Sequence, residues 1–82
     1  MINSSMDKLK TAFINVLGMS PADDFDSMAY GQTLGWDSVA HMALISEIET
    51  AFDIMLDTDD VIGMSSFLKA KEILARNGVS FA

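Results

Sequence analysis

The segment Leu34–Val39, with the sequence LGWDSV, lies between a long polar loop and a strongly apolar stretch. Asp37 and Ser38 are residue types favoured at helix starts, because their side-chain oxygens accept hydrogen bonds from free backbone N–H groups. Apolar residues then recur at intervals of three and four, which predicts a helix over residues 38–52. The residues on its apolar face are Leu44, Ile45, Ile48 and Phe52.

The chain before this helix divides into a second helix and a loop. The apolar spacing predicts a helix over residues 4–17, with Ser4 or Ser5 as its N-cap and Gly18 as its end. Residues 19–37 are rich in aspartate and glycine, which predicts a long ordered loop. The apolar anchors expected to order this loop are Phe25, Met28, Tyr30 and Leu34.

The chain after the helix at 38–52 predicts two further helices. The first is short, over residues 57–63, with Asp57 or Thr58 as its cap. The second opens at Ser65 or Ser66 and turns Phe67, Ala70, Ile73 and Leu74 towards a core. No segment alternates as a strand does, so we expect an all-α fold. It is a small four-helix bundle, with three main helices, a short third helix and a long first loop.

Length and composition indicate a single domain over residues 1–82, because so short a chain supports only one core. No run approaches the roughly 18 apolar residues of a membrane span, so no membrane insertion is expected. The polar residues 1–10 do not resemble a secretory signal, which makes the cytoplasm the expected location. The chain has no cysteine, which excludes disulfides, thiolate metal sites and a cysteine nucleophile.

The formal net charge of -7 is unevenly distributed. Most of the 12 Asp and Glu residues lie between residues 19 and 62, where no Lys or Arg occurs. Nucleic acid is an unsuitable partner for such a surface, because phosphate binding needs positive charge. A basic protein surface is the natural complement, although acidity also serves solubility alone.

Ser38 is the candidate for covalent chemistry. A phosphoryl group on its hydroxyl would face unpaired N–H groups and the positive end of a helix, so the position suits a phosphate ester. The alternative is that Ser38 is only the N-cap of that helix.

The LGWDSV segment, followed by an amphipathic helix ending in ETAFDI at residues 49–54, resembles the acyl carrier protein family. The family signature is Asp-Ser-Leu at the start of the second helix, and the helix order agrees along nearly the whole chain. The resemblance implies that a phosphopantetheinyl transferase attaches 4'-phosphopantetheine from coenzyme A to Ser38. Asp37 would help to position the transferase's magnesium or cap the helix. The chain would be a carrier without catalytic residues or a resident metal.

The resemblance also implies a monomer that carries acyl thioesters between acyl-activating, acyltransferase or synthase enzymes with basic docking surfaces. The residues predicted to be recognised by partners are Trp36, Val39, Met42, Glu47, Glu49, Asp53, Asp59 and Asp60. Trp36 is expected to add a large amphipathic surface of the kind favoured in interfaces. The residues predicted to line an acyl pocket are Met42, Ile45, Met55, Ile62 and Met64.

Several alternatives remain open at this point. Val39 stands where the family has leucine, and the second helix has fewer carboxylates than is common in fatty-acid carriers, which favours a specialised pathway. The cargo is acyl or aminoacyl, with Trp36 favouring acyl because peptidyl carriers usually have glycine there. His41, one turn after Ser38, either approaches the phosphate or packs against the loop. A further hypothesis is that the chain is a carrier-like protein-interaction subunit that is never modified.

Two other classes of protein do not fit the sequence. A calcium loop that began at Asp57 would place Ile62 where its turn glycine is required. A serine hydrolase lacks the nucleophile-elbow motif, and His41 on the same helix as Ser38 does not supply a base and an oxyanion hole.

Overall fold

The computed structural model describes residues 4–81. Residues 1–3 and 82, which the single-domain prediction includes, lie outside the described residues. The elements are α1 (Ser5–Leu17), the 3-10 turn η1 (Phe25–Ser27), α2 (Ser38–Phe52), α3 (Thr58–Gly63) and α4 (Phe67–Arg76). Within residues 4–81 there is no strand, and an isolated bridge joins Ala29 to Ser66. The all-α bundle predicted from the sequence is confirmed.

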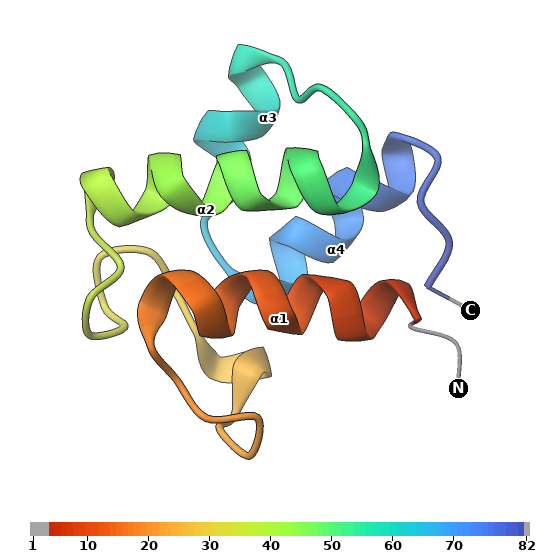
Figure 1. Ribbon diagram of the computed structural model, residues 1–82. Helices are drawn as coiled ribbons and strands as arrows, with labels where there is room; N and C mark the ends of the chain where they lie inside the picture. The colour runs from red at the N-terminus through yellow and green to blue at the C-terminus, as the bar shows by residue number, and fades with distance from the viewer. Residues whose placement is uncertain (1–3, 82) are drawn as a thin grey trace.

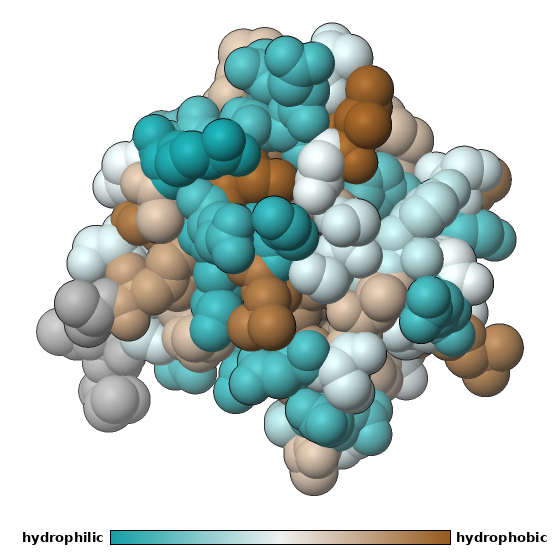
Figure 2. All heavy atoms as spheres, turned by 180° about the vertical axis from the view of Figure 1, so that it is seen from behind, coloured by the Kyte–Doolittle hydropathy of each residue, from teal (hydrophilic) through white to brown (hydrophobic). Residues whose placement is uncertain are grey.

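The two long helices α1 and α2 lie side by side, and α4 crosses behind them (Figure 1). The short α3 lies beyond α2, at the top of the view, and the long first loop turns below α1 before it rises to the start of α2. The opposite face carries apolar side chains only in separate patches among hydrophilic ones (Figure 2). Within residues 4–81, no helix has the length and apolarity that crossing a membrane requires.

Side-chain caps set the start of each described α-helix. In every case a Ser or Asp oxygen accepts a hydrogen bond of 2.8 to 3.0 Å from the N–H three residues later. The caps are Ser4, Asp37, Asp57 and Ser66. Each satisfies an N–H group that the first turn leaves without a partner inside the helix. The starts could therefore be read from the sequence to within one residue.

Aromatic rings join the helices at the centre of the core. The Phe13 ring on α1 makes edge-to-face contacts with Trp36 and Phe67, with ring centroids 5.3 Å and 5.1 Å apart. Phe25 of η1 also packs against Phe67, with ring centroids 5.1 Å apart. Edge-to-face pairs add to the free energy gained by burying the rings. The loop is thus held against α4 by the same cluster that joins α1 to α4.

Two of the expected loop anchors do not serve as core residues. Phe25 and Met28 are buried as predicted, but Leu34 is 95% exposed and Tyr30 is 43% exposed. Trp36 takes the core position instead, with only 1% of its surface exposed. The prediction that Trp36 adds an exposed surface for partners is wrong, because its ring packs on Phe13.

Phe13→Ala is expected to lower the free energy of unfolding by about 3 to 5 kcal/mol, because it leaves a cavity where three aromatic rings meet. Leu34→Ala, the matched control on an exposed apolar residue, is expected to change it by less than about 0.5 kcal/mol. Urea denaturation followed by circular dichroism measures both values. Equal effects of the two substitutions would contradict this description of the core.

Candidate functional site

Ser38 is the first residue of α2 and is exposed. The N-cap is Asp37, whose carboxylate accepts a hydrogen bond of 2.9 Å from the N–H of Ala40. The reading of Ser38 as only an N-cap is therefore wrong, because its neighbour supplies the cap. The capping role predicted for Asp37 is confirmed. The Ser38 hydroxyl stands at the positive end of a helix, where an anionic group is favoured.

The loop that leads to Ser38 is folded back on itself by hydrogen bonds. The Trp36 backbone donates to the Thr33 carbonyl at 3.1 Å and accepts from the Gly31 N–H at 3.1 Å. The Tyr30 N–H donates to the carbonyl of Ser65, beside the start of α4, at 2.8 Å. Gly35 adopts a φ of 86°, which a residue with a side chain rarely does. These bonds hold the segment before Ser38 in a defined position.

His41 connects this loop to α3. The indole N–H of Trp36 donates to His41 Nδ1 at 3.0 Å, and His41 Nε2 lies 2.8 Å from the Val61 carbonyl oxygen. An indole nitrogen can only donate and a carbonyl can only accept, so both bonds form together only in the neutral ring with its hydrogen on Nε2. Both ring nitrogens are thus occupied. The packing of His41 against the loop is confirmed, and neither nitrogen is free for a phosphate on Ser38.

A cavity of about 340 Å³ opens beside Ser38, between α2 and α3. Its walls are mostly apolar. Its lining residues are Tyr30, Ser38, His41, Met42, Val61, Ile62, Met64 and Ser65. Three of the five predicted pocket residues, Met42, Ile62 and Met64, lie here. Ile45 is instead buried in the core, and Met55 is 87% exposed. Neither residue lines this cavity, so these two predictions are wrong for it.

Tyr30, Val61 and Ser65 were not among the predicted site residues. Tyr30 comes from the first loop, whereas Val61 and Ser65 come from α3 and the segment after it. Each reaches the cavity only because the loop and α3 fold against α2. No local sequence pattern indicates such a contact. A signal for it would have to relate residues that lie far apart in the chain.

The predicted recognition residues do not form one surface. Val39 and Met42 are 78% and 59% exposed next to Ser38, and Ile62 of α3 is 75% exposed. The Glu49 carboxylate accepts the Leu56 N–H at 2.9 Å and so holds the turn after α2. Exposed apolar side chains therefore lie close to the serine, whereas the half-buried Glu49 holds the turn after α2.

The acidic residues near α3 also differ in what they contact. Asp60 accepts from Asn77 at 3.1 Å and pairs with Arg76 at 3.4 Å, and its side chain is only 15% exposed. Asp59 is exposed in the first turn of α3. Asp53 ends α2 in the left-handed region, at a φ of 53°. Asp59 is thus freer to meet a partner than Asp60.

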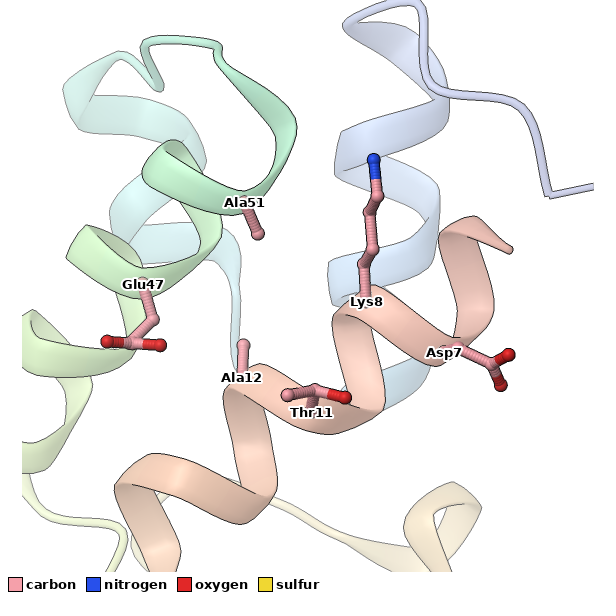
Figure 3. A pocket seen from close by; sticks show the side chains of 6 residues that line it. All are labelled: Asp7, Lys8, Thr11, Ala12, Glu47 and Ala51. Carbon is pink, nitrogen blue, oxygen red and sulfur yellow. The ribbon is translucent and has the colours of Figure 1, made fainter. Parts of the chain in front are cut away.

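Glu47 lies on the other side of α2 from Ser38. The two are nine residues apart in sequence, which is two and a half turns at about 3.6 residues per turn. Glu47 and Ala51 border a shallow hollow of about 160 Å³, across which lie Lys8 and Ala12 of α1 (Figure 3). A partner seated over Ser38 does not reach this hollow without spanning the helix.

Asp37→Ala is expected to lower the free energy of unfolding by about 1 kcal/mol, because it removes the cap of α2. Asp37→Asn keeps a capping oxygen and is expected to cost only a few tenths of a kcal/mol, from the lost charge at the helix start. Urea denaturation measures both. An Asp37→Asn protein as unstable as Asp37→Ala would show that the hydrogen bond to Ala40 is not what stabilises the helix start.

The model of one protein family, described as the phosphopantetheine attachment site, matches residues 7–69 of the chain. No curated protein and no solved structure matches it. The matched region includes α2, α3 and the cavity, and members of the family carry a covalently attached 4'-phosphopantetheine group. Because this family model matches most of the chain, and the exposed serine and its cavity lie within the match, the chain belongs to the phosphopantetheine attachment site family.

Proposed function

We propose that this chain is an acyl carrier protein that holds acyl intermediates as thioesters on 4'-phosphopantetheine attached to Ser38. The observation that carries the proposal is the position of the exposed Ser38 hydroxyl at the start of α2, beside the apolar cavity. The group's terminal thiol supplies the thioester chemistry that a chain without cysteine cannot supply itself. The chain's own residues anchor and position the phosphopantetheine group, and none of them is catalytic.

The residues at this end of α2 fit a phosphate diester. In the loading step, the Ser38 oxygen forms a bond to the phosphorus of coenzyme A that bears the pantetheine. The bond from that phosphorus to the nucleotide half breaks, and the hydroxyl proton leaves to a base of the transferase or to water. The helix start then faces the remaining negative charge favourably. Asp37 is proposed to help position the transferase's magnesium, with its second carboxylate oxygen available beside the capping one.

An acyl cargo is favoured over an aminoacyl or peptidyl one by the apolar lining beside Ser38. Met42, Ile62 and Met64 offer methyl and methylene groups there, which an acyl chain can contact with a gain in free energy. A charged amino group gains nothing from such a wall. The pathway is proposed to be fatty-acid-like or specialised, with the cargo set by the enzymes that load the carrier.

Partner enzymes are proposed to dock over the apolar surface around Ser38 formed by Val39, Met42 and Ile62. The net charge of -7 attracts enzymes with basic docking surfaces and raises the rate of encounter. Weak, rapidly exchanging contacts suit a carrier that must leave each enzyme after transfer. The same net charge favours a monomer, and we place its action in the cytoplasm, where transferases have access to coenzyme A.

Incubation with coenzyme A, magnesium and a broad-specificity phosphopantetheinyl transferase is expected to add the mass of one phosphopantetheinyl group, read by intact mass spectrometry. Ser38→Ala is expected to gain nothing, whereas Ser65→Ala, which removes the other serine of the cavity, is expected to load fully. Asp37→Asn keeps the cap and is expected to load more slowly. A folded protein that two transferases fail to load, or a loaded Ser38→Ala, would overturn the assignment and favour an unmodified interaction subunit.

The docking surface is tested with two lysine substitutions at physiological salt. Met42→Lys is expected to raise the KM of the transferase for the carrier about tenfold, because it places a charge in an apolar contact. Glu47→Lys changes the net charge more than Met42→Lys does, because it also removes a negative charge. Residue 47, however, lies about 13 Å along the helix from Ser38, beyond the screening length of about 8 Å. A change of less than about twofold is expected for it. Equal effects would show that net charge, and not the face of α2, determines docking.

A further inference from the structure

The short helix α3 has no buried residue of its own. Asp60 of α3 contacts Arg76 and Asn77 at the end of α4. The Val61 carbonyl of α3 accepts the hydrogen bond from His41 at 2.8 Å. Within residues 4–81, that bond is the side-chain hydrogen bond that connects α2 to α3. His41 therefore supplies the bond from α2 that helps to hold α3 over the cavity, while Asp60 holds α3 to α4.

His41 also forms part of the cavity wall between Ser38 and α3. Its ring stacks on the buried Trp36, with centroids 6.0 Å apart and planes 24° from parallel. Met64, which is fully buried, forms another part of the cavity wall. A chain that extended from Ser38 deeper between α2 and α3 would have to separate His41 from Val61. The imidazole N–H and the carbonyl would then both be left without partners in an apolar setting, which is unfavourable.

We propose that His41 limits how deeply an acyl group on Ser38 reaches between α2 and α3, and so acts as a positioning residue for the cargo. The inference rests on the proposed carrier function. With the bond to Val61 in place, a short acyl group lies within the cavity and the end of a long one stays in solvent. Without it, α3 moves outward, Met64 yields because its side chain is flexible, and the gap admits a longer chain.

Two variants separate the hydrogen bonds of His41 from its presence as a side chain. His41→Ala removes both bonds. His41→Gln keeps one acceptor, for the Trp36 indole N–H, and one donor, for the Val61 carbonyl. The glutamine protein should therefore behave as the histidine one does. If His41→Ala does not fold, His41→Leu fills similar space without either polar atom and carries the same expectations.

The cargo test uses carriers loaded on Ser38 with butyryl or decanoyl phosphopantetheine, confirmed by intact mass. Cleavage of each thioester by hydroxylamine measures how exposed it is. In the unchanged protein and in His41→Gln, the two thioesters are expected to be cleaved at similar rates. In His41→Ala, cleavage of the decanoyl thioester is expected to slow by about fivefold to tenfold relative to butyryl, the size of effect that one hydrogen bond allows.

A second measurement needs no cargo. Amide hydrogen exchange over residues 58–63 is expected to be about tenfold faster in unloaded His41→Ala than in the unchanged protein, and unchanged in His41→Gln. The inference is wrong if the ratio of decanoyl to butyryl cleavage is the same in His41→Ala as in the unchanged protein, or if exchange in α3 does not respond. A protein that never loads refutes the carrier function instead, while the exchange measurement still tests the contact.

Discussion

The pair of hydrogen bonds made by His41 is the interaction on which the site depends most. Trp36 is buried directly before Asp37 and Ser38, and its indole N–H needs a partner in the core. His41 supplies the acceptor and passes the connection on to α3 through Val61. One neutral imidazole thus joins the loop before the serine, the start of α2 and the helix that covers the cavity. The loop before the serine and the helix over the cavity consequently share one side chain as a contact.

The acidic residues of the chain have more than one role. Asp37 and Asp57 cap helices, Glu49 holds the turn after α2, and Asp60 secures α3 to α4. Each of these carboxylates satisfies a donor that would otherwise depend on water. The net charge still steers basic partners at a distance, but the side chains exposed next to Ser38 include the apolar Val39, Met42 and Ile62 beside the charged Asp37. We therefore expect close docking to be decided by shape and apolar contact, and encounter by charge.

A carrier must hold its cargo without retaining it. The cavity beside Ser38 is open and lined by flexible methionine side chains, together with the hydroxyl-bearing Tyr30 and Ser65. Such a wall gains modest free energy from an acyl group and has no rigid, closed shape that would resist release. The bundle itself stays anchored by the aromatic cluster of Phe13, Trp36 and Phe67. The firmly packed aromatic cluster keeps the bundle rigid, and the open cavity beside Ser38 contacts the cargo only loosely. Together they suit a carrier that must hold its cargo and then release it.

The sequence by itself determined the helices, their order and the position of Ser38. Local rules govern these features: Asp37 and Ser66 are strong caps, Gly18 takes the left-handed conformation, and apolar spacing marks the buried faces. Only the tertiary structure decided that Trp36 is buried while Leu34 is exposed, that Met55 and Ile45 lie off the cavity, and that His41 bonds to Val61 across 20 residues. Those outcomes depend on which surfaces meet when the loop and α3 fold onto α2, and no pattern within a single segment contains that information.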